Sequence, residues 1–169
     1  DKEFLLNSLQ KDLDYALEHN ISTNPILLAF VDTVKKYNIS TEHINAFILS
    51  MRYDLSKTAY NTTKEIEEYI YGSANVVGLM CLKVFCNGAN EMYEHLKDSA
   101  ESLGSAFQKV NFLRDLKYDI NELGRSYFPE LEHNTFNPET KALIEQSIEK
   151  DFKLAYIGLK QLPGRSKLA

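Results

Sequence analysis

The apolar residues of this chain recur every three or four positions, which is the spacing of amphipathic helices, and no stretch alternates convincingly as a strand would. The first segment shows the pattern, because residues 3–18 place apolar side chains at Phe4, Leu5, Leu9, Leu13, Ala16 and Leu17. The same spacing returns along most of the chain. The fold class is therefore expected to be all-α, with helices of very different lengths.

Capping residues mark where these helices begin and end. Asn24-Pro25 predicts one helix start, and the capping-box form of Thr62 to Glu65 predicts the start of a long helix. Asn87-Gly88 predicts the end of that long helix. The expected helices cover residues 3–18, 25–37, 41–51, 63–85, 89–119 and 138–162, with an interruption near 97–99 and a loop over 121–137.

The composition fits one domain of an ordinary globular type. The chain has 169 residues, of which 44% are hydrophobic and 25% are charged, and its formal net charge is −5. That charge offers no basic field, so nucleic acid is not expected as a partner. No run of about 18 apolar residues occurs, so no transmembrane helix is expected.

The two cysteines point to a reducing compartment. Cys81 and Cys86 stand five positions apart in one expected helix and point about 140° away from each other, so no disulfide between them is expected. The start of the sequence has no signal-peptide character. We therefore expect a cytoplasmic location, with membrane contact limited to peripheral association because no dedicated amphipathic anchor is present.

Candidate chemistry comes from one polar stripe in the expected helix over residues 89–119. Gln108, Asn111, Asp115 and Asp119 stand three, four and four positions apart, so they fall within about 80° of one another on a helix. Two carboxylates one turn apart repel each other unless a cation lies between them, and Mg²⁺ prefers oxygen ligands. The stripe therefore indicates either half of a site for a metal-bound anion such as a diphosphate, or an ordinary solvated helix face.

The neighbours of this stripe favour burial of the helix. Phe107, Val110, Leu113 and Leu116 cover most of the remaining circumference, and a helix that is apolar nearly all round is usually buried. A buried acidic pair needs a counterion or a protonated member. These neighbours therefore favour a buried pair, with a counterion or a protonated member, over a solvated one.

A second unusual segment, residues 69–80, carries glycine inside a helical pattern. Gly72 and Gly78 each cost roughly 1 kcal/mol relative to alanine in a helix interior. Something must lie against the backbone that these small residues expose. Close helix–helix packing is one interpretation, and the wall of a cavity that holds an apolar chain is the other.

Two further segments carry weaker signals. Asp54 and Tyr60 bracket a short connection, where a lone aspartate is more often a cap or a solvated residue than a catalytic one. Residues 124–129 follow the acidic helix, and there Arg125 could pair with a diphosphate or with the acidic pair. Tyr127 and Phe128 could cover a pocket, or simply anchor a loop.

Taken together and in this order, these segments resemble the squalene/phytoene synthase family of head-to-head isoprenoid synthases, and most closely bacterial phytoene synthases. The residues that carry the resemblance are Asp54 through Tyr60, Glu65 through Met80, Leu103 through Gln108, Asn111 through Asp115 with Asp119, and Gly124 through Pro129.

The resemblance implies an isoprenoid-synthase-type helical bundle around a central cavity, with residues 1–169 forming a single helical domain within a larger synthase domain. It implies Mg²⁺, or Mn²⁺ in its place, and prenyl diphosphate substrates. The implied reaction is the condensation of two geranylgeranyl diphosphates to phytoene, in carotenoid biosynthesis. The alternative is a squalene or dehydrosqualene synthase that uses farnesyl diphosphate, with NADPH required only by the squalene type.

The resemblance also implies a role for individual residues. Asp115 and Asp119 would hold the metal together with Asn111, and Gln108 would face the diphosphate from the same stripe. Arg114 would bind phosphate or orient a carboxylate, and Tyr69 would lie near the reacting carbons. The remaining substrate-binding residues would be Ser73, Ala74, Val77, Gly78, Arg125 and Tyr127.

One departure from the family is serious. Such enzymes carry two aspartate-rich motifs on facing helices, and the first, which should precede residue 3, is absent here. The chain therefore looks like an internal fragment of a larger domain. A non-catalytic helical relic of this fold is the second hypothesis. The sequence does not indicate the chain length of the substrate or the oligomeric state.

Overall fold

The computed structural model describes residues 1–57, 60, 62–123, 127–128 and 136–168, and every regular element within them is a helix. This confirms the all-α prediction. The elements are α1 (Lys2–His19), α2 (Pro25–Tyr37), α3 (Thr41–Ser56), α4 (Thr63–Ile70), η1 (Tyr71–Asn75), α5 (Val76–Cys86), α6 (Asn90–Leu123), α7 (Pro138–Leu159) and η3 (Ser166–Leu168).

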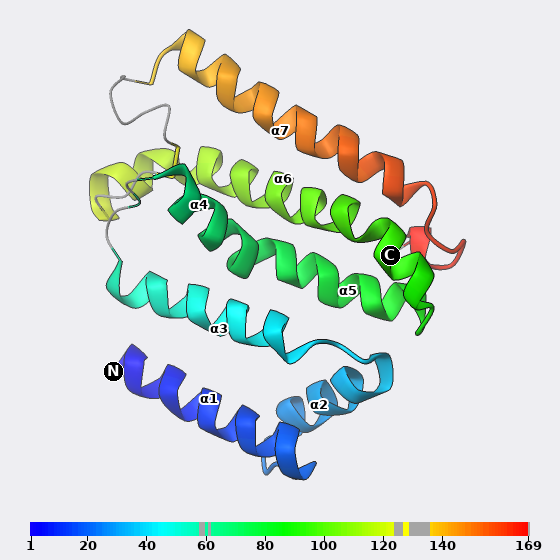
Figure 1. Cartoon of the computed structure of the whole chain (residues 1–169). Coiled ribbons are helices and arrows are strands. Elements are labelled where there is room, and N and C mark those ends of the chain that lie inside the picture. Colours follow the sequence, from blue (N-terminus) through cyan, green and yellow to red (C-terminus); the bar gives the residue numbers. More distant parts are fainter. Residues whose placement is uncertain (58–59, 61, 124–126, 129–135, 169) are drawn as a thin grey trace.

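The helices form an array in which sequence neighbours lie side by side. Figure 1 shows α7, α6, the α4–α5 path, α3 and α1 following one another across the molecule, with α2 against α1. The path from α4 through η1 to α5 is one continuous helical stretch, and η1 is π-helical. This stretch packs against α3 on one side and α6 on the other, so it forms the middle of the array.

The predicted caps are confirmed. The Asn24 side chain accepts a hydrogen bond from the Ile26 amide, and both hydrogen bonds of the capping box between Thr62 and Glu65 are present. Asn87 ends α5 in the left-handed conformation, with φ of 47°. These signals are local, so the sequence alone placed the helix starts correctly.

The predicted interruption near residues 97–99 is wrong, because α6 is one helix from Asn90 to Leu123. Packing on two sides explains its continuity. The Ser99 hydroxyl donates to the Leu154 carbonyl of α7 at 3.1 Å, and Leu96 is buried against α5. The helix also continues four residues past Asp119, so the loop predicted from residue 121 begins later.

By length and composition, the stretch Thr63–Cys86 is the one helix among the described residues that could cross a membrane. The sequence analysis expected no such helix. In this structure 39% of its apolar window is buried, and Val76 and Leu79 are among the buried residues. The apolar character of this stretch is therefore used in part for packing between α3 and α6.

Glycine allows α6 to approach the π-helical segment closely. A Cβ added at Gly104 would lie 2.8 Å from both the Ala74 carbonyl oxygen and the Asn75 Cα. Both are backbone atoms, so neither can swing aside as a flexible side chain could. The spacing between α6 and η1 therefore depends on the absence of a side chain at residue 104.

Gly104→Ala is expected to lower the free energy of unfolding by about 1–3 kcal/mol, because the added methyl group forces the two backbones apart. Urea denaturation followed by circular dichroism measures this change. Gly164→Ala is the matched control, since a Cβ at Gly164 meets nothing within 4 Å. Equal stability of the two variants would contradict the close approach.

Candidate active site

The polar stripe occupies one side of α6 and is half-buried at Gln108, Asn111, Asp115 and Asp119. Next to it, the exposed Arg114 donates from Nε to Oδ1 of Asp115 at 2.8 Å and from Nη2 to Oδ2 at 2.6 Å. These hydrogen bonds are the main cause of a lowered pKa at Asp115 and of a raised pKa at Arg114. Asp115 is therefore ionised at neutral pH, as a metal ligand must be.

The predicted burial of the acidic pair is wrong. The Asp115 side chain is 45% exposed, and on the same helix Phe107 is 56% and Val110 is 40% exposed. The physical reason is that α5 and α7 pack against α6 from two sides and leave the face between them open. The carboxylate of Asp115 is instead balanced by the guanidinium of Arg114.

Apolar surface adjoins the stripe on the same helix. Leu103, Phe107, Asn111, Asp115 and Asp119 follow one another at intervals of four residues, so each lies about 40° further around α6 than the last, and the strip turns by about 160° from Leu103 to Asp119. The apolar end of this strip borders a groove of about 460 Å³ between α6 and α7. The groove is lined by Leu103, Glu149, Phe152, Lys153, Ala155, Tyr156 and Leu159.

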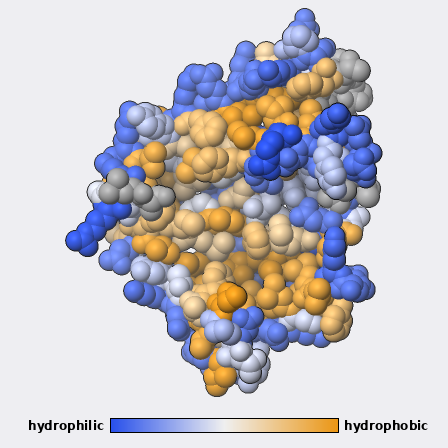
Figure 2. Space-filling model, turned by 180° about the vertical axis from the view of Figure 1, so that it is seen from behind, coloured by the Kyte–Doolittle hydropathy of each residue, from blue (hydrophilic) through white to orange (hydrophobic). Residues whose placement is uncertain are grey.

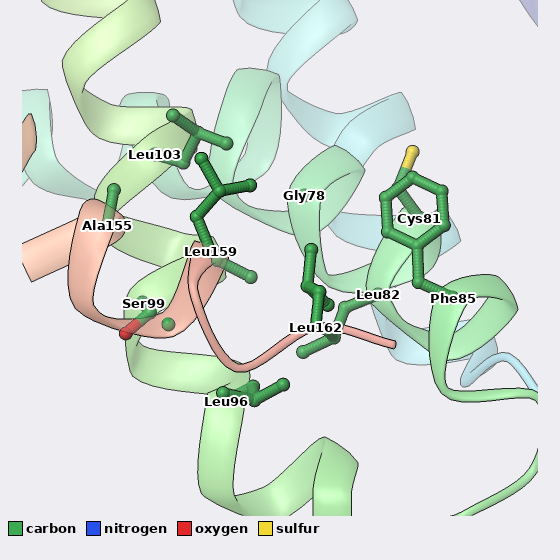
Figure 3. A pocket seen from close by; sticks show the side chains of 12 residues that line it. Gly78, Cys81, Leu82, Phe85, Leu96, Ser99, Leu103, Ala155, Leu159 and Leu162 are labelled. Carbon is green, nitrogen blue, oxygen red and sulfur yellow. The ribbon is translucent and has the colours of Figure 1, made fainter. Parts of the chain in front are cut away.

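The groove adjoins a partly open apolar hollow of about 100 Å³, with which it shares Leu103, Ala155 and Leu159. Figure 3 shows side chains from α5, α6, α7 and the segment after α7 converging around this hollow. Gly78 lies on its wall, where a Cβ would meet the Ala100 carbonyl at 2.7 Å. Gly78 therefore satisfies both interpretations of the 69–80 segment, close packing and a cavity wall.

Apolar side chains are also exposed away from this groove. Phe4 and Leu5 of α1 and Ile157 of α7 are each more than half exposed. Seen from behind, apolar side chains extend across the middle of the array and hydrophilic ones gather toward its rim (Figure 2). The array thus presents a broad apolar surface in addition to the hollow itself.

A buried aromatic cluster lies at the other end of the α4–α5 stretch. The Tyr69 hydroxyl donates to Oδ1 of Asp54 at 2.7 Å, and its ring stacks on Phe112 and Tyr127 at centroid distances of 6.1 and 5.6 Å. Tyr60 packs against Tyr69 with ring centroids 5.0 Å apart. Burial, followed by the hydrogen bond to Asp54, raises the pKa of Tyr69 strongly, so the phenol stays neutral.

Phe112 connects this cluster to the polar stripe, because it directly follows Asn111 on α6. Its ring lies 4.1 Å from that of Tyr127 with the two planes 7° apart. The structure therefore places Tyr69 and Tyr127 against Phe112 of the acidic helix. Their expected roles near the reacting carbons and in substrate binding stay predictions. Arg125 lies outside the described residues.

The π-helical turn was not foreseen from the sequence. Within it, the Ser73 hydroxyl and the Asn75 side-chain oxygen are buried without a hydrogen-bond partner among the described residues. Single π turns inside α-helices are frequent at functional sites. Ala74 is half-buried beside Gly104, whereas Val77 is 39% exposed. The substrate-binding roles of these residues stay predictions.

Comparison with known proteins identifies the family. The family model described as squalene/phytoene synthase matches residues 1–155. The chain belongs to this family. The crystal structure of squalene synthase HpnC from Alicyclobacillus acidocaldarius superposes with a TM-score of 0.82, over 99% of this chain and 67% of that chain, at 23% identity. At that identity, the likeness shows the squalene synthase fold and nothing finer.

Two curated relatives show the range of activities among similar proteins. The phytoene synthase of Arthrospira platensis is 31% identical over 139 residues, which cover 76% of this chain and 44% of that protein. The 4,4'-diapophytoene synthase of Staphylococcus haemolyticus is 29% identical over 157 residues, which cover 89% of this chain and 51% of that protein. The chain thus spans about half the length of these squalene/phytoene synthase relatives.

The donors on α6 suit the metal expected for this family. Two carboxylates and an amide, from Asp115, Asp119 and Asn111, are hard oxygen ligands, and Mg²⁺ is commonly bound by one or two carboxylates together with substrate phosphates. Among the described residues, no three His, Cys, Asp or Glu side chains come together as a metal site. The two carboxylates and the amide of α6 would therefore fill only part of the coordination sphere of Mg²⁺.

Asp54 is the site residue that sequence reasoning undervalued. It stands 15 residues before Tyr69, on a different helix, and no periodicity connects the two. Asp54 entered the sequence analysis only as the first residue of the segments that resemble the squalene/phytoene synthase family. The structure shows why it matters, because its carboxylate accepts the hydrogen bond from the Tyr69 hydroxyl within the aromatic cluster.

Proposed function

We propose that the protein carrying this chain condenses two prenyl diphosphates head to head, with geranylgeranyl diphosphate as substrate and phytoene as product. One observation supports this most strongly. A single strip of α6 runs from the apolar hollow through Leu103 and Phe107 to the acidic residues Asp115 and Asp119. An apolar chain with an anionic head group matches such a strip from end to end.

In this proposal the polar end binds the diphosphate. Asp115, Asp119 and Asn111 would hold Mg²⁺, whose positive charge stabilises the departing diphosphate. Arg114 keeps Asp115 ionised, and its exposed guanidinium has further N–H groups available for phosphate oxygens. Gln108 lies almost one turn before Asn111 on α6, and its side-chain amide would donate a hydrogen bond to the diphosphate.

The aromatic cluster would then stabilise the allylic cation that diphosphate departure leaves. The faces of Tyr69, Phe112 and Tyr127 are stacked and buried, and aromatic faces attract positive charge. Buried rings would also keep water away from such a cation and so protect it from capture. Tyr69 remains a neutral phenol, so it offers a ring face and no anionic nucleophile.

A second candidate is supported by the 4,4'-diapophytoene synthase relative, whose match covers more of this chain than that of the phytoene synthase. In that case farnesyl diphosphate would be the substrate and a C30 hydrocarbon the product. NADPH would be required only if the product were squalene. A non-catalytic helical protein is the remaining alternative.

The test is a product assay with purified protein, Mg²⁺ and either C20 or C15 prenyl diphosphate. We expect a C40 hydrocarbon and released diphosphate from the C20 substrate, without NADPH. A C30 product formed from the C15 substrate alone would favour the second candidate. If neither substrate gives a hydrocarbon or releases diphosphate, the proposed function is wrong.

A further inference from the structure

One ring of the aromatic cluster is tilted against the three that are stacked. The planes of Tyr69, Phe112 and Tyr127 lie within 20° of one another. The buried ring of Tyr60 is instead tilted by 46° against Tyr69 and by 38° against Tyr127. The ammonium nitrogen of Lys57 lies 4.6 Å from the centroid of the Tyr60 ring. A positive charge therefore contacts a ring that packs directly on the stack.

The position of Lys57 is set by the end of α3. It follows the last residue of that helix, where cations are favoured, and its backbone amide donates to the Tyr53 carbonyl at 2.7 Å. Its ammonium also lies 5.4 Å from the centroid of the Tyr53 ring. The Lys57 side chain is 25% exposed, so water screens its charge only in part. An unpaired ammonium here would oppose any positive charge that forms in the cluster.

Glu65 supplies a compensating negative charge from the first turn of α4. Lys57 donates from Nζ to Oε1 of Glu65 at 2.8 Å. The second carboxylate oxygen, Oε2, accepts from the Thr62 amide at 3.2 Å as part of the capping box. The start of α4 therefore fixes the carboxylate that pairs with Lys57. Together, the charges of these two side chains cancel.

Departure of the diphosphate breaks a C–O bond, takes both bonding electrons and leaves a positive charge on the prenyl carbon. We propose that Glu65 is a positioning residue that neutralises Lys57, so that this positive charge can form beside the stacked rings. The inference rests on the proposed function, because it takes the aromatic cluster as the place where the charge forms. Without the carboxylate, the ammonium would repel the prenyl cation. It would also compete with the Tyr69 hydroxyl for Asp54, which stands about one turn earlier on α3.

Three variants separate the charge of the pair from its structural role. Glu65→Gln removes the negative charge and keeps a side-chain oxygen that can close the capping box. Lys57→Met removes the ammonium and keeps a long apolar side chain. The third variant combines both changes. Glu68→Gln is the matched control, because Glu68 pairs with Lys64 on the same helix at 3.8 Å, with its side chain 57% exposed.

The first measurement is the rate of hydrocarbon formation. Glu65→Gln should lower kcat about tenfold and change KM little, because the uncompensated ammonium opposes a charge that forms only after the diphosphate departs. Lys57→Met and Glu68→Gln should stay close to the unmodified rate. The double variant should recover to within about twofold of that rate, although it lacks both partners. A pair that only supported the fold would leave the double variant at least as slow as Glu65→Gln.

The second measurement does not require turnover. A C20 prenyl ammonium ion, added with Mg²⁺ and inorganic diphosphate, imitates the separated prenyl cation, and the C20 prenyl alcohol is its uncharged counterpart. Calorimetry gives the Kd of each. Glu65→Gln should weaken binding of the ammonium about tenfold and leave binding of the alcohol unchanged. The double variant should restore the affinity for the ammonium.

The outcomes separate the inference from the proposed function. If hydrocarbon forms but Glu65→Gln keeps the full rate, or the double variant stays as slow as Glu65→Gln, the inference is wrong and the proposed function stands. If no hydrocarbon forms but the ammonium follows the expected pattern, the proposed function is wrong and the charge compensation by Glu65 stands. If no hydrocarbon forms and the ammonium binds all variants equally or none of them, both proposals are wrong.

Discussion

Asp115→Asn is expected to reduce diphosphate release from geranylgeranyl diphosphate by about 10³-fold or more, because it removes one of the two carboxylates proposed to hold Mg²⁺. The isosteric amide keeps the size of the side chain and removes its charge. Stability should change little, since the pair with Arg114 is largely solvent-exposed and such pairs contribute little. The lower rate of diphosphate release would therefore reflect the lost metal ligand rather than unfolding of the variant.

The measurement is initial-rate diphosphate release over a range of Mg²⁺ concentrations. A synthase whose metal ligand has been removed requires more Mg²⁺ and does not recover its full rate at saturation. Asp32→Asn is the control, because Asp32 is exposed on α2, away from the α6 strip, and should leave the rate unchanged. Unchanged release by Asp115→Asn would support the non-catalytic alternative.

Asp119→Asn should resemble Asp115→Asn, and the double variant should lose little more than either single one. Two ligands of one metal act as a unit, so the effects of removing them are far from additive. Additive losses, with each single variant retaining substantial activity, would instead indicate that the two carboxylates act separately.

Local signals explain what the sequence could predict. The caps at Asn24, Thr62 and Asn87 depend on residues within one turn of each helix end. The sequence therefore predicts them without knowledge of the tertiary fold. The polar stripe on α6 depends only on helical periodicity, and it too was predicted correctly. The family resemblance rested on the stripe together with the short segments 54–60, 65–80, 103–108 and 124–129, and on their order.

Tertiary surroundings explain what the sequence could not predict. The exposure of Phe107 and Val110 depends on which helices cover α6, and no periodicity specifies that. The π turn at residues 71–75 arises where Gly72 packs against Ser50 and Gly104 approaches Ala74, so it depends on contacts with two other helices.

The hydrogen bond between Tyr69 and Asp54 allows a second decisive test within the aromatic cluster. Tyr69→Phe keeps the ring that stacks on Phe112 and Tyr127 and removes only the hydroxyl. We expect turnover to fall by about 10²-fold, as is typical when a positioned polar group at a reaction centre is removed. The free energy of unfolding should fall by only about 1 kcal/mol, the usual contribution of one hydrogen bond.

Asp54→Asn separates the charge of the carboxylate from its position. The amide oxygen can still accept from the Tyr69 hydroxyl, so the ring keeps its place, whereas the negative charge near the proposed allylic cation is lost. We expect a fall in turnover of about tenfold, since charge-assisted hydrogen bonds are roughly twice as strong as neutral ones. Turnover and melting temperature are measured together, with Tyr15→Phe as control because Tyr15 is 55% exposed on α1. If Tyr69→Phe retains full turnover, Asp54 and Tyr69 only support the fold, and the reacting carbons lie elsewhere along the α6 strip.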